Sequence, residues 1–342
     1  MTKTDYRNIV SLLKTSSNII ITSHHNPDGD AVGSAVAMYH VLRKSVKNIT
    51  VILPNRFPDF LRWIRGSEQV VIFDQQDEKE MEKLFSKAGV VFCLDYNSPS
   101  RVDKMEKYIR ETPAAKILID HHPNPDNDAF DYVLSETSAS STAELVYQFV
   151  VNTGMRANID KPAAECLYTG IVTDTGSFSF ACNNAETYRI TAELISLGVD
   201  AEKLHRLIYD TFSESRLRLM GYAFAEKLVV LPEFHTAIIS LTRKELNDYK
   251  YKNGDTEGLV NYPLSIKEIN VSIMLTERED LIRLSFRSKG DFAVNRIAKE
   301  HFEGGGHKNA AGGNSHQSMQ ETIEKIKSVL PLYKDELDYV IK

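Results

Sequence analysis

The run NIIITSHHNPDGDAVGSAVAM occupies residues 18–38 and joins a strand pattern directly to a helix pattern. Three isoleucines at 19–21 predict a short buried strand. Nearly every side chain over 31–42 is apolar, which predicts a helix packed inside the protein. In open α/β sheets, ligands bind where a strand ends and the next helix begins. The polar residues between these two elements are therefore candidates for a functional site.

These polar residues have the spacing of metal ligands. His24, Asp28 and Asp30 form the pattern H-x-x-x-D-x-D, and Gly29 allows a tight turn between the two carboxylates. One imidazole with two carboxylates suits a divalent ion such as Mn, Mg, Fe or Zn. The alternative is a solvated turn, because Pro-Asp-Gly is also ordinary turn chemistry. Matching clusters further along the chain favour the metal site.

Three further apolar runs also end in acidic or imidazole side chains. They stop at Asp74, at Asp95 and at Asp120-His121-His122. Strand and helix patterns alternate between them, which predicts βαβ units and a mostly parallel sheet. The carboxyl ends of parallel strands meet at one edge of the sheet, so we expect side chains far apart in sequence to converge there. Asp174, which follows an apolar helical stripe over 161–172, is a further candidate.

Length, charge and cysteine content limit the class of protein. A chain of 342 residues is long enough for two domains. Its net charge of −6 argues against binding of long nucleic acid, which usually requires a basic surface. Three cysteines without a C-x-x-C pair fit a reducing compartment. The N-terminus lacks a signal peptide pattern, and no run reaches the ~18 apolar residues of a membrane span. We expect a soluble cytoplasmic protein.

The C-terminal third combines a glycine-rich run with local positive charge. Hairpin patterns over 227–241 and 269–286 predict a smaller mixed α/β domain. Five of the ten residues over 304–313, GGGHKNAAGG, are glycine, and six Lys and Arg oppose three acidic residues over 283–308. A glycine-rich loop is often only flexible, but it can also bring backbone N–H groups close to a phosphate. Arginine grips phosphate with two hydrogen bonds, so Arg287 favours a phosphate or nucleotide site.

In their order along the chain, these motifs resemble those of the DHH phosphoesterase superfamily. The matching segments are HHNPDGDAVGS at 24–34, Asp95, Asp120-His121-His122, TDTG at 173–176 and, in the accessory domain, GGGH at 304–307. The branch that the chain resembles most comprises bacterial proteins that degrade nanoRNA, dephosphorylate 3′,5′-bisphosphonucleosides and, in some members, cleave linear or cyclic dinucleotides. The resemblance implies a catalytic domain over 1–190, a helical connector over 191–228 and a substrate-binding domain over 229–342, with the active site in the cleft between the two domains.

The resemblance also implies a role for each candidate residue. One ion would be held by His24, Asp28 and Asp95, and a second by Asp30, Asp95, His121 and Asp174, so that Asp95 bridges them. His122 would contact the substrate phosphate, and Asp120 would orient the histidines. The substrate would be bound by Arg287, Ser288, Gly305, Gly306 and His307. Family members usually prefer Mn²⁺, whereas the ligand set alone also admits Mg²⁺ and other divalent ions. Two ions about 3.5–4 Å apart can share one hydroxide and neutralise charge at phosphorus.

Two nearby residues are expected to lie outside the ligand set. His24 already meets the family spacing, so His25 is expected to have a supporting or structural role. The neighbours of Asp74 do not match the second motif of the DHH family. The expected substrate is a short oligoribonucleotide or nucleotide. A pyrophosphatase or exopolyphosphatase and a nucleotide-binding sensor without turnover remain alternatives. The sequence leaves the oligomeric state open, a homodimer included.

Overall fold

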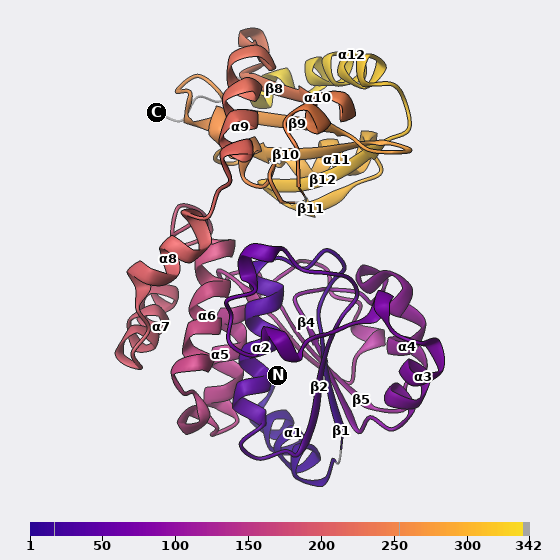
Figure 1. Ribbon diagram of the computed structural model, residues 1–342, viewed down its shortest axis with the longest axis vertical. Helices are drawn as coiled ribbons and strands as arrows, with labels where there is room; N and C mark the ends of the chain where they lie inside the picture. The colour runs from indigo at the N-terminus through magenta and orange to yellow at the C-terminus, as the bar shows by residue number, and fades with distance from the viewer. Residues whose placement is uncertain (17, 253, 338–342) are drawn as a thin grey trace. The chain divides into compact units, whose positions relative to one another are not determined.

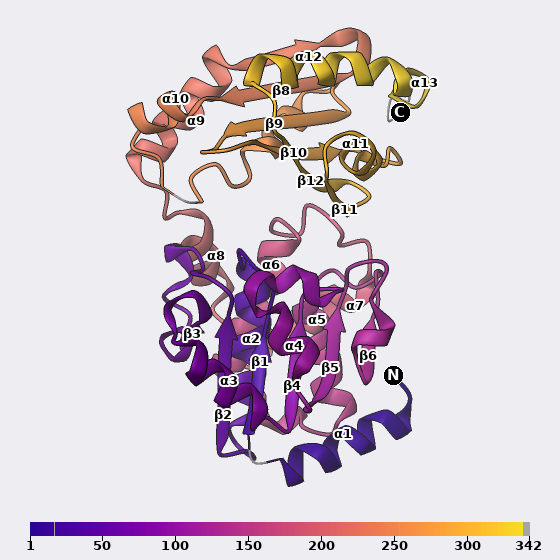
Figure 2. The ribbon, with the colours of Figure 1, turned by 90° about the vertical axis from the view of Figure 1, so that its right-hand side faces the viewer.

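Six strands of the first half of the chain form a parallel sheet in the order β3-β2-β1-β4-β5-β6. Every pairing recorded between neighbouring strands is parallel, which confirms the predicted sheet. Figure 2 shows their arrowheads pointing in the same direction. The bounds are β1 (Asn18–Thr22), β2 (Asn48–Leu53), β3 (Val71–Ile72), β4 (Val90–Leu94), β5 (Ala115–Asp120) and β6 (Tyr132–Ser135).

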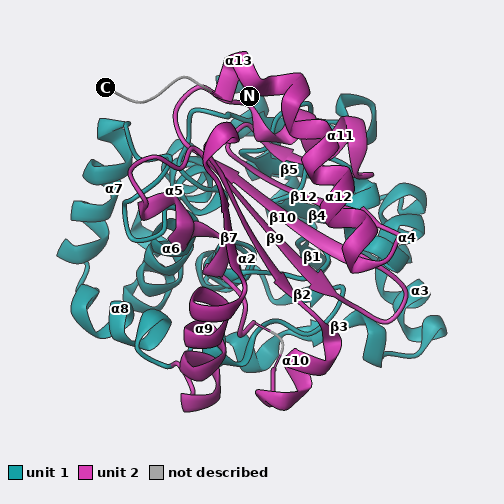
Figure 3. Cartoon of the chain, turned by 90° about the horizontal axis from the view of Figure 1, so that it is seen from above, with its two compact units in different colours: residues 1–211 teal, residues 212–342 magenta. Residues whose placement is uncertain are grey.

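The computed structural model describes residues 1–16, 18–252 and 254–337. The chain forms two compact units, Met1–Thr211 and Phe212–Lys342, which are coloured separately in Figure 3. The connector predicted over 191–228 includes the end of α7 (Ala185–Ser196), α8 (Ala201–Tyr209) and α9 (Glu214–Glu226). The division of the chain into three segments stays a prediction.

Helices cover both faces of the parallel sheet because successive strand residues point to opposite faces. Ile19 and Ile21 belong to one hydrophobic core, whereas Ile20 belongs to the other. In Figure 1, α2, α5 and α6 cover the first face, and α3 and α4 cover the second. The first six helices are α1 (Lys3–Thr15), α2 (Gly29–Leu42), α3 (Glu78–Ser86), α4 (Glu106–Glu111), α5 (Thr142–Asn152) and α6 (Lys161–Asp174).

Helix α2 is buried along almost its whole length, as its apolar pattern predicts. It packs closely against α6 because both helices carry a glycine at the contact. A Cβ atom on Gly33 would lie 2.6 Å from the backbone oxygen of Cys166, and one on Gly170 would lie 2.7 Å from Oδ1 of Asp30. A larger residue at either position would force the helices apart. This packing holds Asp30, in the first turn of α2, against α6.

Two features of unit 1 differ from the sequence prediction. Strand β6 has no predicted counterpart, because it is a short edge strand in which only Leu134 is buried, so its apolar pattern is weak. Asp74 does not end a strand as predicted. Strand β3 is only two residues long, and Asp74 lies in the following 3-10 helix, η3 (Phe73–Gln75), where its N–H donates to the backbone oxygen of Pro54.

Unit 2 is built on a mixed sheet in the order β11-β12-β10-β9-β8-β7. The pair β8–β9 is parallel, and the other recorded pairs are antiparallel. Both predicted hairpins, β7–β8 and β9–β10, are confirmed. The strands are β7 (Leu228–Leu231), β8 (Thr236–Leu241), β9 (Val271–Glu277), β10 (Ile282–Ser288), β11 (Gly305–His307) and β12 (Ala310–Ser315). The helices after α9 are α10 (Arg243–Asp248), α11 (Val294–His301), α12 (Met319–Val329) and α13 (Lys334–Leu337).

The glycine-rich run, described as a loop from its sequence, is a β-hairpin. Strand β11 pairs with β12, and β12 pairs with β10 on its other side. Gly306 has a φ of 136°, and a Cβ atom there would lie 2.6 Å from the backbone oxygen of Ala310. The backbones approach too closely for a side chain at this position. The glycines therefore allow strand pairing, which the composition alone did not distinguish from a flexible loop.

Candidate metal centre

The carboxyl ends of three adjacent strands carry the predicted ligands. His24 follows β1, Asp95 follows β4 directly, and Asp120 is the last residue of β5. These strands are neighbours in the sheet, so their ends meet at one edge. The donor atoms form groups that lie within 4.8 Å of one another: His24 with Asp28 and Asp95; Asp30 with His121 and Asp174; and Asp95 with Asp120 and His122. All six predicted metal ligands therefore converge.

Asp95 lies between the two groups that resemble metal sites. Its Oδ2 is 3.4 Å from Nε2 of His24, and its Oδ1 is 3.7 Å from Nε2 of His121. His24 Nε2 is 4.0 Å from Oδ1 of Asp28, and His121 Nε2 is 3.5 Å from Oδ2 of Asp174. One carboxylate thus presents a different oxygen to each group. This arrangement is compatible with a carboxylate shared by two ions.

The backbone of Asp95 is in an unusual conformation, with a φ of 64°. This left-handed region is uncommon for residues other than glycine, and it concentrates at functional sites. The Asp95 N–H still donates to the backbone oxygen of Ile119, so the residue continues the β4–β5 pairing while its side chain turns toward the histidines. This backbone conformation places the Asp95 carboxylate between His24, which follows β1, and His121, which follows β5.

Asp30 is buried and held on both carboxylate oxygens. Oδ1 accepts hydrogen bonds from the N–H of Ala143 at 2.9 Å and from the hydroxyl of Ser34 at 3.1 Å. Oδ2 accepts from the N–H of Thr142 at 2.6 Å. The amino end of a helix favours a negative charge, so α5 stabilises the Asp30 carboxylate in this position. Oδ2 accepts one of these three hydrogen bonds, so its second lone pair could also bind a cation.

The shortest recorded contact of the His122 ring is with Asp120. Nδ1 of His122 is 2.7 Å from Oδ1 of Asp120, whose side chain is fully buried. This contact fixes the orientation of the imidazole and favours protonation at Nδ1, so Nε2 is the nitrogen that faces away from Asp120. Among the residues that the structure describes, Oδ2 of Asp120 has no hydrogen-bond partner.

The pKa values of the buried histidines are raised by the carboxylates around them. Burial lowers the pKa of His24, but its hydrogen bond with Asp95 and the charges of Asp28 and Asp95 outweigh burial and raise that pKa to about 9. Burial also lowers the pKa of His121, and the charges of Asp174 and Asp95 raise it to about 9. Without an ion, both imidazoles therefore retain positive charge at neutral pH.

Burial and neighbouring charges also shift the pKa values of the carboxyl groups in this cluster. Burial raises the pKa of Asp174, opposed in part by His121, to about 7. Burial and the charge of Asp95 raise the pKa of Asp30 well above its ordinary value. Burial also opposes ionisation of Asp95, but His24 lowers the pKa of this carboxyl overall. Bound protons thus offset part of the negative charge of this cluster, and divalent cations would neutralise it more fully. A donor set of imidazoles and carboxylates fits such ions.

His25 and Asp74 lie outside these donor groups of the described residues, as the sequence predicts. His25 donates its backbone N–H to the oxygen of Arg101, and its ring faces Asp103 at 3.9 Å. Asp74 pairs with Lys104 at 3.4 Å. Both residues have local partners that account for their positions.

Sequence reasoning missed the role of the amino end of α5 and the residues just before it. The pattern at 141–142 predicts only a helix cap, and Ser141 does cap α5. Thr142 also donates its hydroxyl to Oδ1 of Asp95, at 2.9 Å, although the two residues are 47 positions apart in the chain. The sequence does show three hydroxyl residues in a row at 140–142, shortly before Glu144. The partners of these hydroxyl groups, however, depend on the tertiary structure.

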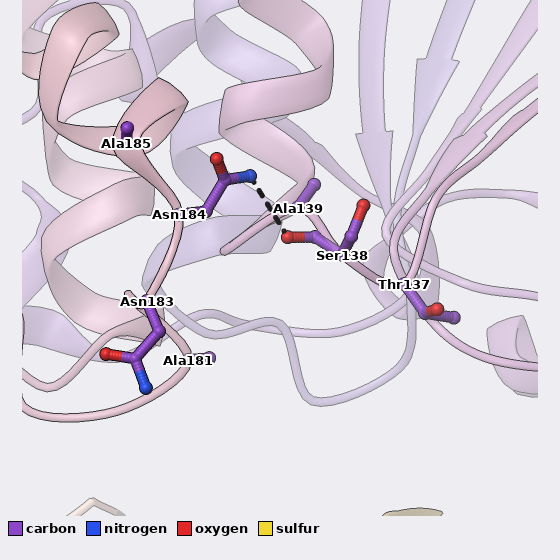
Figure 4. Close-up of a pocket in the computed structure, with 7 residues that line it drawn as sticks. All are labelled: Thr137, Ser138, Ala139, Ala181, Asn183, Asn184 and Ala185. Carbon is purple, nitrogen blue, oxygen red and sulfur yellow. Dashed lines mark hydrogen bonds between the residues drawn. The ribbon is translucent and has the colours of Figure 1, made fainter.

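A hollow of about 550 Å³ opens beside this segment (Figure 4). Its walls come from the loop before α5 and the loop before α7, which are joined by a hydrogen bond of 3.3 Å from the Asn184 amide to the backbone oxygen of Ser138. The lining residues are Thr137, Ser138, Ala139, Ala181, Asn183, Asn184 and Ala185.

The residues predicted to bind substrate lie around the β10–β12–β11 ladder of unit 2. Arg287 and His307 both pair with Ala310 from opposite sides, so the three side chains emerge on one face of the sheet. Gly305 and Gly306 are exposed on β11. Ser288 is buried, donates its hydroxyl to the backbone oxygen of Phe292 and accepts from Asn309. These contacts give Ser288 a structural role in the ladder.

Part of the positive charge predicted near this ladder is already paired. Lys308 lies 2.7 Å from Asp291, and Arg296 lies 2.8 Å from Glu336. Glu336, the acidic residue of the second pair, lies outside residues 283–308, over which the charges were counted. Arg287 donates to the backbone oxygen of Phe286 and is half-buried.

Models of two protein families match the chain. The DHH family, N-terminal domain, matches residues 18–171, and the DHHA1 domain matches residues 234–332. The bifunctional oligoribonuclease and PAP phosphatase NrnA of Bacillus subtilis is 30% identical over 91% of this chain and 93% of its own length. The chain belongs to the DHH family. The family resemblance seen in the sequence motifs is thereby confirmed.

Two further proteins to which the chain is similar have names that state different activities. A crystal structure of an exopolyphosphatase-related protein from Bacteroides fragilis has a TM-score of 0.95 and 41% identity, and the match covers 99% of this chain and 98% of the other. The cyclic-di-AMP phosphodiesterase GdpP of Bacillus subtilis is 29% identical over 94% of this chain and 49% of its own length. Among the described residues, no helix is both long and apolar enough to cross a membrane.

Proposed function

We propose that the chain is a two-metal phosphoesterase that hydrolyses short nucleotide substrates, such as linear dinucleotides and nanoRNA, to mononucleotides. The observation that carries the proposal is the position of Asp95, whose two oxygens face His24 and His121 separately. A single-ion site would not need a carboxylate shared in this way. The names of the related proteins, an oligoribonuclease and a cyclic dinucleotide phosphodiesterase, support a nucleotide substrate.

Each side chain of the cluster has a part in this chemistry. His24, Asp28 and Asp95 would hold one ion, and Asp30, Asp95, His121 and Asp174 would hold the other. Two such ions, most favourably Mn²⁺, would activate a water molecule and neutralise charge at phosphorus. His122, with both ring nitrogens protonated, would donate from Nδ1 to Asp120 and from Nε2 to a phosphate oxygen. The Asp120 carboxylate would hold this imidazolium in place.

The substrate is proposed to be short because the chain lacks the charge that long nucleic acid requires. With a net charge of −6, binding energy must come from a few local contacts and not from a long basic track. Arg287 and His307, on one face of the β10–β12–β11 ladder, would contact a phosphate or nucleotide of the substrate. Bisphosphonucleosides such as pAp and cyclic dinucleotides fit the same reasoning and belong in the test.

The proposal is tested with a panel of substrates in the presence of Mn²⁺ or Mg²⁺ and chromatographic identification of products. Linear dinucleotides to pentanucleotides, pAp and a cyclic dinucleotide are compared with pyrophosphate and polyphosphate. We expect mononucleotides to form fastest from the shortest oligonucleotides, and faster with Mn²⁺. Faster turnover of pyrophosphate or polyphosphate would replace this function with that of an inorganic phosphatase. Tight nucleotide binding without any product would indicate a sensor.

Arg287→Ala and His307→Ala are each expected to raise KM for a dinucleotide by about tenfold, because one charge-assisted hydrogen bond contributes about 1.5–3 kcal/mol. Metal content should stay at the level of the unmodified protein, since neither residue is one of the six predicted metal ligands. Arg243→Ala is the matched control, because Arg243 is an exposed arginine of unit 2 that pairs with Glu279. Unchanged kinetics from dinucleotide to pentanucleotide would remove Arg287 and His307 from the site.

A further inference from the structure

The amino end of α5 contacts both carboxylates that lie deepest in the metal cluster. The hydroxyl of Thr142 donates to Oδ1 of Asp95 at 2.9 Å, and its N–H donates to Oδ2 of Asp30 at 2.6 Å. All three side chains are almost completely buried, so water does not compete for these hydrogen bonds. One residue thus joins the two proposed metal groups from the side of α5.

The helix does not need the Thr142 hydroxyl for its own stability. Ser141 already supplies the cap by accepting a hydrogen bond from the N–H of Glu144. The buried carboxylate of Glu144 in turn accepts from the N–H and hydroxyl of Ser140 and from the hydroxyl of Thr187 in α7. These contacts hold the segment in place whether or not residue 142 carries a hydroxyl. The hydroxyl is therefore available for Asp95.

The hydrogen bond from Thr142 fixes the rotation of the Asp95 carboxylate. With Oδ1 held by the hydroxyl, Oδ1 faces His121 and Oδ2 faces His24. A rotation about the bond to the carboxylate would turn both oxygens away from these positions. We infer that Thr142 is a positioning residue that sets the bridging orientation of Asp95. The inference rests on the proposed two-metal function, because orientation matters only if Asp95 is shared by two ions.

Thr142→Val tests this inference because valine keeps the shape of threonine and removes only the hydroxyl. The ion-free protein is titrated with MnCl₂ by calorimetry, and kcat and KM are measured for a dinucleotide. We expect the affinity for at least one of two ions to fall by about 10–100-fold, the usual effect of losing a group that orients a ligand. We expect kcat to fall with KM nearly unchanged, and Thr142→Ser, which keeps the hydroxyl, to restore both affinity and kcat.

Thr191→Val is the matched control, because Thr191 is also buried and its hydroxyl donates to a helix backbone oxygen, that of Thr187. It should lose comparable thermal stability and keep full Mn²⁺ affinity. If Thr142→Val does not fold, Thr142→Ala replaces it as the hydroxyl-free variant. Wild-type Mn²⁺ affinity without the hydroxyl, or an equal loss in Thr142→Ser, overturns the inference alone. Failure of the unmodified protein to bind two Mn²⁺ ions overturns the proposed function itself.

Discussion

Asp95→Ala is expected to reduce hydrolysis of a dinucleotide to the background rate, the largest effect of any single substitution proposed for this chain. The carboxylate contacts both donor groups, so its removal weakens both ion sites at once and leaves His24 and His121 without their shared partner. Loss of a single transition-state contact typically lowers kcat by about 10²–10³-fold. Loss of a shared ligand should exceed that value, because both ions lose their positions relative to the phosphate.

Turnover and metal content, measured together after dialysis against Mn²⁺, check this prediction. The unmodified protein should retain two ions per chain, and the Asp95→Ala protein fewer. Asp74→Ala is the matched control: Asp74 was also predicted to follow a strand, but it pairs with Lys104 and belongs to none of the donor groups. It should keep both turnover and metal. A fully active Asp95→Ala protein would end the two-metal interpretation.

His122→Ala is expected to keep both ions and to lose about 10²–10³-fold in kcat, the usual effect of removing one hydrogen-bond donor to the transition state. The structure supports a separation of these effects because Nδ1 of His122 faces Asp120, at 2.7 Å, and lies 3.8 Å from Asp95. Nε2 of His121, its neighbour in the sequence, lies 3.7 Å from the same oxygen of Asp95 and 3.5 Å from Asp174. The two histidines thus share Asp95 but differ in their nearest carboxylate, Asp174 for His121 and Asp120 for His122, and should have different roles.

The same two measurements distinguish these roles. His121→Ala should lose an ion along with activity, whereas His122→Ala should lose activity alone. His25→Ala is the control, because His25 also adjoins a predicted ligand and its ring faces Asp103, outside the metal cluster. Loss of an ion from the His122→Ala protein would make His122 a ligand. Retention of full kcat would exclude it from the reaction.

Much of the metal cluster was predictable because its residues follow buried strands. Apolar runs that end in Asp95 or in Asp120-His121-His122 specify where the chain leaves the sheet, and alternation of strands with helices implies that these ends share one edge. Asp74 shows the limit of that reasoning. It follows an apolar run just as Asp95 does, but β3 is a two-residue strand at the edge of the sheet, away from the central strands β1, β4 and β5.

By itself the sequence determined the parallel sheet, the buried α2 and the smaller mixed domain, because local periodicity encodes them. Its resemblance to the DHH family singled out the six residues that are predicted to be metal ligands. Only the tertiary structure decided which oxygen of Asp95 faces which histidine, that Thr142 holds that carboxylate, and that the glycine-rich run pairs as a hairpin. The reason is physical: the orientation of Asp95 and its contact with Thr142 join segments tens of residues apart, and these segments meet only when α2, α5 and α6 pack on the sheet. The hairpin is stabilised by the pairing of β12 with β10, which a local pattern does not record.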